Sequence, residues 1–196
     1  GRYDPVADTW SSISTGANCP KARYSSSMDW TGSEMILWGG LTSVGLNDGA
    51  RYNPSTDTWR AISQGANLPI GRGSALSAWT GEKWIIVTGS DGFVGVNSGG
   101  IYDPVTDTWK ATSTGSNVPS ARWMASGAWT GSRLLVWGGT VSGGTVYPNA
   151  GAQYDPGTDT WAPISTGTNL PLGRYYNSSA WTGSRLLIWG GNTSAT

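Results

Sequence analysis

The apolar residues of this chain gather in short continuous runs. Met35–Trp38 and Leu134–Trp137 are two of these runs, and each is four residues long. A run of this length between turn residues predicts a strand that is covered on both faces, because a half-exposed strand would alternate apolar and polar positions. Small residues precede the runs, as in Ser25–Ser27 and Ala125–Gly127. No stretch of helical period and length intervenes, so the pattern predicts an all-β fold.

The pattern is repeated four times along residues 1–196. The phrase Tyr-Asp-Pro-x-x-Asp-Thr-Trp recurs at steps of 49, 50 and 52 residues, with Asn53 in place of one aspartate, and starts at Tyr3, Tyr52, Tyr102 and Tyr154. Each phrase is followed by Pro-x-x-Arg, then Trp-Thr-Gly, then an apolar run that ends in a glycine pair, with Gly89-Ser90 as the variant. A fixed order at a period of about 50 residues predicts one supersecondary unit repeated along a single domain.

Turn signals divide each unit into four short strands. Asp-Pro and Thr-Gly mark the hairpin reversals. The first strand follows the arginine, the second is the apolar run, the third ends at the repeated tyrosine, and the fourth begins at the tryptophan of Asp-Thr-Trp. Four antiparallel strands in about 50 residues are typical of a propeller blade, and the small residues of the first strand suit the crowded central axis.

Together, the glycine pair, Tyr-Asp-Pro, the tryptophan that follows it and Pro-x-x-Arg resemble the kelch repeat, and specifically bacterial secreted-type kelch repeats. The resemblance covers the whole chain and implies a kelch-type β-propeller with the first strand innermost and the fourth outermost. One departure is that the residue after the arginine, where familiar kelch sequences often reach a histidine, is Tyr24, Gly73, Trp123 or Tyr175. The copper-dependent oxidase activity of some similar propellers needs histidine ligands and does not carry over.

The repeat begins and ends in the middle of a blade. The chain opens with a third and fourth strand in Arg2–Ile13 and closes with a first and second strand that lead to Ser184–Gly191. Joining the two halves removes two sheet edges, which would otherwise invite pairing with other chains. We therefore expect the termini to complete one blade. Three arrangements stay open: a closed ring of four blades, an eight-bladed ring of two self-associated chains, and a part of a longer propeller.

Composition narrows the range of partners. Lys and Arg together number 12, as do Asp and Glu, so the chain lacks the basic excess that would neutralise nucleic-acid phosphates. Its apolar runs fall far short of the roughly 20 residues of a membrane span. With Cys19 as the single cysteine and no histidine, intrachain disulfides, zinc fingers and Ser-His-Asp triads are excluded. We expect no cofactor and no metal.

Residues that recur in every unit are expected to serve the blade. Asp4, Asp103 and Asp155 precede prolines and are expected to cap turn amides. The repeated tryptophans are expected to form the core between blades, because each buries a large area and leaves one N–H to satisfy. Asp29 stands where the other units have alanine, but no second carboxylate is placed to form an acid/base pair with it. The sequence thus favours a non-catalytic protein.

A candidate ligand site lies at the start of the first strands. Four arginines recur there, and they are either paired structural residues or a ring of guanidinium groups that holds carboxylates or sulfates at the propeller mouth. Three of them precede an aromatic residue, which either stacks on a sugar or peptide ligand or fills a gap between blades. The candidate ligand-binding residues are Arg23, Tyr24, Arg72, Arg122, Trp123, Arg174 and Tyr175.

The features above predict a recognition or display module that binds a small acidic glycan or peptide, outside the cell or on its surface. The location is inferred from few lysines and abundant Ser, Thr, Gly and Trp, which resemble secreted bacterial kelch arrays. Asn177 and Asn192 begin triplets of the glycosylation type. Two other readings are a sugar-processing enzyme on the same ring and a structural subunit of a larger assembly.

Overall fold

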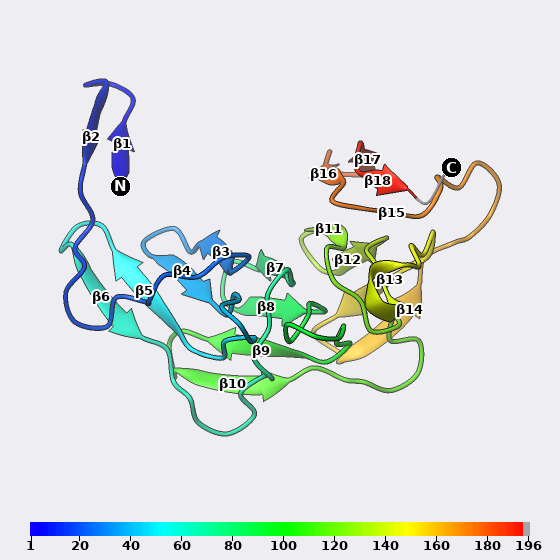
Figure 1. Ribbon diagram of the computed structural model, residues 1–196, viewed down its shortest axis with the longest axis horizontal. Coiled ribbons are helices and arrows are strands. Elements are labelled where there is room, and N and C mark those ends of the chain that lie inside the picture. The colour runs from blue at the N-terminus through cyan, green and yellow to red at the C-terminus, as the bar shows by residue number, and fades with distance from the viewer. Residues whose placement is uncertain (194–196) are drawn as a thin grey trace.

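The computed structural model describes residues 1–193 and is built almost entirely of antiparallel strands (Figure 1). Three four-stranded sheets follow one another along the chain. The first contains β3 (Ser27–Trp30), β4 (Met35–Trp38), β5 (Gly49–Asn53) and β6 (Thr58–Ala61). The second contains β7 (Leu76–Trp79), β8 (Trp84–Val87), β9 (Gly99–Asp103) and β10 (Thr108–Ala111). The third contains β11 (Ser126–Trp129), β12 (Leu134–Trp137), β13 (Gly151–Asp155) and β14 (Thr160–Pro163). These are the kelch blades that the repeat predicts.

Local turn chemistry forms each blade as expected. In the Thr-Gly turn before β4, the Thr31 hydroxyl donates to the Glu34 carbonyl at 3.0 Å and accepts from the Glu34 amide at 3.0 Å. In the Asp-Pro turn after β9, Asp103 Oδ1 accepts from the Val105 amide at 2.8 Å. The predicted capping role is confirmed for all three aspartates of Tyr-Asp-Pro, at Asp4, Asp103 and Asp155.

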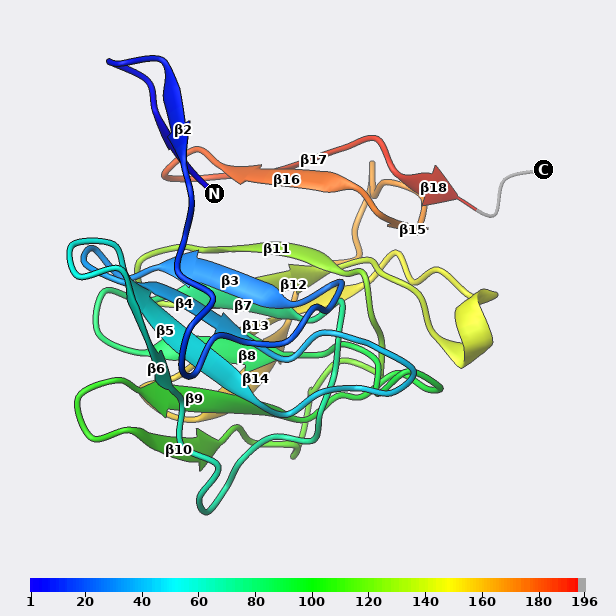
Figure 2. The ribbon, with the colours of Figure 1, turned by 60° about the vertical axis from the view of Figure 1, so that its left-hand side comes forward.

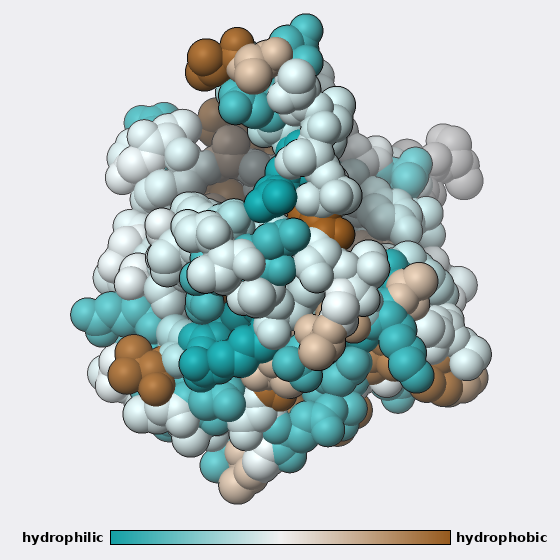
Figure 3. Space-filling view, turned by 90° about the vertical axis from the view of Figure 1, so that its left-hand side faces the viewer, coloured by the Kyte–Doolittle hydropathy of each residue, from teal (hydrophilic) through white to brown (hydrophobic). Residues whose placement is uncertain are grey.

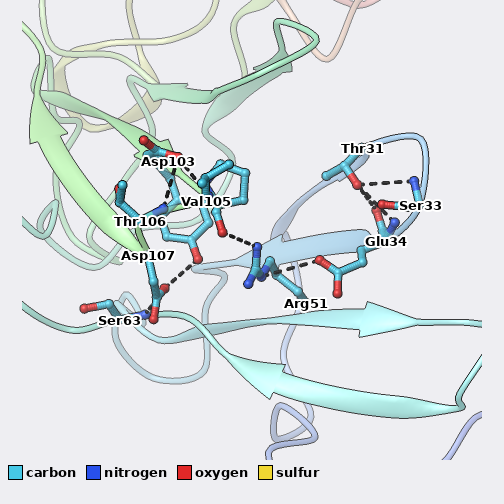
Figure 4. Close-up of polar contacts among 11 residues, drawn as sticks. Thr31, Ser33, Glu34, Arg51, Ser63, Asp103, Val105, Thr106 and Asp107 are labelled. Carbon is cyan, nitrogen blue, oxygen red and sulfur yellow. Dashed lines mark hydrogen bonds and ion pairs between the residues drawn. The ribbon is translucent and has the colours of Figure 1, made fainter.

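The repeated phrase also fastens each blade to the preceding one. Tyr102 donates its hydroxyl proton to Asp107 Oδ1 at 2.5 Å, and the Ser63 amide, which follows β6 of the preceding blade, donates to the same atom at 3.0 Å (Figure 4). Trp109 Nε1 then donates to the Ser63 carbonyl at 3.1 Å. The same set of bonds recurs at the next interface, through Asp159 and Ser113. The phrase is therefore an inter-blade latch as well as a hairpin signal.

Apolar side chains pack between neighbouring blades. Trp109 is 4% exposed and packs against Tyr102 and Trp38, with ring centroids 5.1 and 5.5 Å apart. The inner strands β3, β7 and β11 lie side by side at the axis (Figure 2). Space there is tight, because a Cβ on Gly127 would collide with the Leu135 carbonyl oxygen. The predicted small residues at the axis are confirmed. The predicted tryptophan core is confirmed at Trp109 and Trp161, whereas Trp59 is half-buried and Trp10 is 74% exposed.

The two ends of the chain form separate two-stranded sheets. At one end, β1 (Arg2–Asp4) pairs with β2 (Thr9–Ser11), and this hairpin stands out at the top of the face in Figure 3. At the other end, β16 (Ser178–Trp181) pairs with β17 (Leu186–Trp189) and lies beside β11, while β15 (Arg174–Tyr175) pairs with β18 (Asn192–Thr193). Figure 1 places the hairpins on opposite sides of an open arc. Completion of one blade by the termini is not formed here and stays a prediction.

Candidate functional site

The repeated arginines lie at the start of the inner strands, and two of them are fully enclosed. Arg72 is 1% exposed, and its Nη1 donates to the Thr88 and Ser98 carbonyls at 3.0 and 2.5 Å. Arg122 is also buried, and its Nη1 donates to the carbonyls of Gly138 and Ala150, both at 2.9 Å. Burial lowers the pKa of both arginines to about 10, so they stay protonated at neutral pH. Each arginine ties the loop that precedes a third strand to the end of the second strand.

Arg23 and Arg174, the first and last of the four arginines, also bond to loop atoms but have different partners. Arg23 forms a bidentate pair with the loop residue Asp48, at 2.8 and 2.9 Å, and this pairing lowers the pKa of Asp48. Arg174 donates to the Gly190 and Leu172 carbonyls. Among the described residues, none of the four arginines forms an ion pair with an aspartate of the repeated Tyr-Asp-Pro or Asp-Thr-Trp turns. Their donors hold loops, so the arginines position the mouth of the propeller.

The three aromatic candidates directly follow these arginines along the chain, and Tyr175 belongs to β15. Tyr24 is 60% exposed and donates its hydroxyl proton to the Thr42 carbonyl at 3.2 Å. Trp123 is half-buried, and its backbone pairs with Thr140 of the loop after β12. Tyr175 packs against two further tyrosines, with centroids 4.8 Å from Tyr147 and 5.3 Å from Tyr176. Aromatic faces therefore stand where the loops meet the inner strands.

A central hollow of about 250 Å³ lies where the inner strands begin, beside the aromatic residues Tyr24, Trp123 and Tyr175. Four equivalent residues, one after each aromatic or glycine position, have positive φ angles of 51–55°: Ser25, Ser74, Met124 and Tyr176. All four line the hollow. Backbone bonds join them across blades, because the Ser74 amide donates to the Ser25 carbonyl and the Met124 amide to the Ser74 carbonyl. Left-handed backbone at non-glycine residues is strained by roughly 1–3 kcal/mol each. The same conformation recurs in the turns at Asp57, Asp107 and Asp159, so at the hollow it is a property of the repeat.

The side chain of Asn177, a residue that lines this hollow, makes no hydrogen bond. Its residue is 9% exposed, and neither Oδ1 nor Nδ2 has a hydrogen-bond partner. A buried polar group without a partner costs about 1–3 kcal/mol unless a ligand pairs with it. Sequence reasoning assigned Asn177 only to a glycosylation triplet. The available signal was its departure from the other units, which have Ser26, Ala75 and Ala125 at this position.

The hollow is lined without ionised side chains. Asp29, the unusual acid of an inner strand, lies elsewhere and accepts from Ser77 Oγ and Trp84 Nε1, both at 2.6 Å, so it anchors the neighbouring blade. Within residues 1–193, no group of three or more His, Cys, Asp or Glu side chains is arranged to hold a metal ion. No helix in that part of the chain is long and apolar enough to cross a membrane. The chemistry available at the mouth is hydrogen bonding and aromatic stacking.

Comparison with known proteins agrees with the blade geometry. The chain matches the KLHDC2/KLHL20/DRC7 Kelch-repeats domain over residues 2–139, which is well over half its length and runs from β1 through β12. No curated protein matches the chain. The matched segment contains the first two complete blades and the inner half of the third. On this match and on its recurring four-stranded blades, the chain belongs to the kelch-repeat family.

Proposed function

We propose that this protein is a non-catalytic recognition module whose ligand docks at the propeller mouth. Kelch repeats form protein-interaction modules, and this gives the general role. The observation that carries the proposal is the unpaired carboxamide of Asn177 beside the central hollow. A carboxamide offers two donors and one acceptor oxygen, so it can pair with both the N–H and the C=O of one peptide unit.

The ligand that suits this mouth is a peptide with an uncharged polar group at the hollow and an apolar or aromatic side chain on the rim. The hollow offers hydrogen bonds and no ionised side chain, and Tyr24 and Tyr176 present exposed aromatic faces. An acidic ligand was expected from the arginines, but Arg72 and Arg122 are buried with their donors bonded to loop atoms, and Arg23 is paired with Asp48. A glycan is the second candidate, because aromatic rings also stack on sugar faces.

Peptide selection followed by calorimetry tests the proposal. A random displayed-peptide library and a glycan array are screened against the protein, and the bound probes are titrated into variants. We expect Asn177→Ala to lower affinity by roughly tenfold, because one or two hydrogen bonds are lost, and to leave the melting temperature unchanged or raised. Asn149→Ala, an exposed asparagine outside the hollow, is the control. Unchanged affinity of Asn177→Ala for every selected probe would refute the mouth as the binding site.

We also propose that the two half-blades pair between copies of the chain. Trp10 of β2 and Trp189 of β17 are 74% and 83% exposed, whereas Trp109 and Trp137 at the equivalent positions of complete blades are buried. Pairing of β17 with β1 of a second copy would reproduce the β12–β13 register, with Leu186 opposite Tyr3 as Leu134 is opposite Tyr154. Sedimentation equilibrium should then give a mass that rises with concentration. A monomer at all concentrations would rule this arrangement out.

An extracellular or cell-surface location remains part of the proposal. Its support is compositional, namely three lysines among 196 residues and many serines, threonines and glycines. Of the two glycosylation-type asparagines, Asn192 is exposed and Asn177 is buried. A secreted, glycosylated form should therefore carry sugar at Asn192. Mass spectrometry of the protein from its native source, with separate analysis of cells and medium, tests the location.

A further inference from the structure

An arginine closes the groove between blades at two of the interfaces. It stands one residue before the repeated tyrosine, and its guanidinium reaches the carbonyl of the Asp-Pro or Asn-Pro turn in the next blade. Arg51 Nη1 donates to the Pro104 carbonyl at 2.7 Å, while Glu34 stands 3.6 Å from its Nε (Figure 4). Arg2 Nη1 donates to the Pro54 carbonyl at 3.0 Å. The guanidinium thus bridges neighbouring blades.

The following unit has Ile101 at this position. Isoleucine has no donor, so the Pro156 carbonyl of the third blade has no guanidinium from the second blade. A cavity of about 570 Å³ lies between these two blades, compared with about 410 Å³ for the groove that Arg51 lines and about 490 Å³ for the groove that Arg2 lines. Its lining includes Ile85, Ile101, Trp129, Asp155 and Pro156. The substitution of Ile101 has left this groove open, where Arg2 and Arg51 bridge the two preceding interfaces.

Two lysines and two aspartates line this groove, Lys83, Lys110, Asp103 and Asp155, and the aspartates differ in how firmly they are paired. Lys83 is bound to Asp103 at 2.5 Å, and this pairing lowers the pKa of Asp103 to about 2. Asp155 has only a looser pairing, with Arg133 Nε at 3.8 Å. Asp155 Oδ1 also accepts from the Gly157 and Thr158 amides, at 2.9 and 3.3 Å, so Oδ2 is the oxygen left for a further donor. Asp155, Pro156 and Trp129 share the lining of the groove. Lys110 also lines the groove, but its side chain is exposed and lies 3.9 Å from Asp159.

We propose that this groove receives an arginine side chain of a protein partner. The incoming guanidinium would replace the one that Arg51 supplies from within the chain, with its head at the Pro156 carbonyl and Asp155 and its stem along Ile101 and Trp129. A planar guanidinium presents several donors in a fixed fork and stacks on aromatic rings, which a lysine ammonium cannot do as well. The groove lies at the Thr-Gly and Asp-Pro turns, at the opposite end of the inner strands from the mouth.

Peptide titrations followed by NMR test this site. The probe is acetyl-Gly-Arg-Gly-amide, and the signals observed are the Trp129 indole N–H and the Ile101 methyl groups. We expect these signals to shift with the arginine peptide and to respond at least roughly tenfold more weakly to the same peptide with citrulline or leucine, because those residues lack the charged fork. Equal shifts from the leucine peptide, or no shift from any peptide, would overturn the proposal.

Variants taken from the other repeats provide matched controls. Ile101→Arg should fill the groove from within, as Arg51 does, and abolish the shift without lowering the melting temperature. Ile101→Gln copies Gln153 of the next unit and serves if the arginine variant folds poorly. Arg51→Ile should open the neighbouring groove and add a second responding indole, Trp79, which lines it. Peptide binding that persists in a folded Ile101→Arg variant refutes the site, and this outcome is independent of Asn177 and the mouth.

Discussion

Replacing Trp109 with alanine tests whether the repeated tryptophan holds the blades together. The indole is almost fully buried between the first and second blades, where it packs against Tyr102 and Trp38. Its Nε1 also donates to the Ser63 carbonyl of the preceding blade. Alanine would remove both the packing and this hydrogen bond, so the substitution acts directly on the interface.

The expected loss in the free energy of unfolding is the sum of these two contributions, packing and the hydrogen bond. Truncation of a buried tryptophan to alanine costs about 3–5 kcal/mol in lost transfer free energy and residual cavity. The lost hydrogen bond adds about 1 kcal/mol. We therefore expect a loss of about 4–6 kcal/mol, a large part of the roughly 5–15 kcal/mol that stabilises a natural domain. Trp10 occupies the equivalent position of the first half-blade but is mostly exposed, and Trp10→Ala should cost less than about 1 kcal/mol.

Urea unfolding measured by far-UV circular dichroism provides the comparison. Fluorescence is recorded on the same samples, because a chain of repeats can unfold in more than one step and coincident transitions are needed to extract a free energy. The slope of free energy against urea should be unchanged in both variants. A Trp109→Ala loss below about 1 kcal/mol, or equal losses for Trp109→Ala and Trp10→Ala, would refute the core assignment.

Two further predictions concern the polar fasteners. Arg122→Ala should cost about 2–4 kcal/mol in urea unfolding, because it removes the donor to the buried Gly138 carbonyl and one of the two donors to the Ala150 carbonyl. A loss below about 0.5 kcal/mol, as at an exposed position, would show that the arginine does not hold the loop. Stability should also fall as pH drops below about 4. Burial raises the pKa of Asp107, but the hydrogen bonds from Tyr102 and the Ser63 amide lower it by more, so the pKa in the folded protein lies below the unfolded value. The stabilisation is present above the unfolded pKa and lost as pH falls through the folded pKa, and Tyr102→Phe should flatten this dependence in thermal melts; an unchanged pH profile would exclude the latch as its source.

The sequence could predict the blades because their determinants are local. Turn residues such as Thr31 and Asp103 bond to amides two or three positions away, and the apolar runs need only neighbours of the same kind. The role of the arginines could not be predicted in the same way. Arg122 donates to a carbonyl of Ala150, 28 residues away, and any residue in that loop would supply the same acceptor. Sequence identifies side-chain partners well, but it does not reveal a backbone partner brought close by loop geometry.

Burial was equally hard to predict at the ends of the chain. Trp10 and Trp109 have the same local sequence, Asp-Thr-Trp, yet one is exposed and the other buried. The difference arises because a four-stranded blade packs before Trp109, whereas residues 1–193 supply no blade to cover Trp10. In a repeat protein, burial depends on the neighbouring unit, so the first and last units depart from the rest even where the sequence does not.

Departures of single units from the repeat carry the remaining information, but a departure does not by itself indicate a binding site. Asp29 departs from three alanines, and its carboxylate is occupied by Ser77 and Trp84 of the next blade. Asn177 departs in the same way, and its carboxamide has no partner. Ile101 departs by removing a donor, so the Pro156 carbonyl lacks the bridge that Pro104 has. The useful criterion is therefore a departure that leaves a hydrogen-bonding group unmet, because that group gains most from an added ligand. Asn177 meets this criterion directly, and Ile101 meets it by comparison with Arg51, which supplies the donor at the preceding interface.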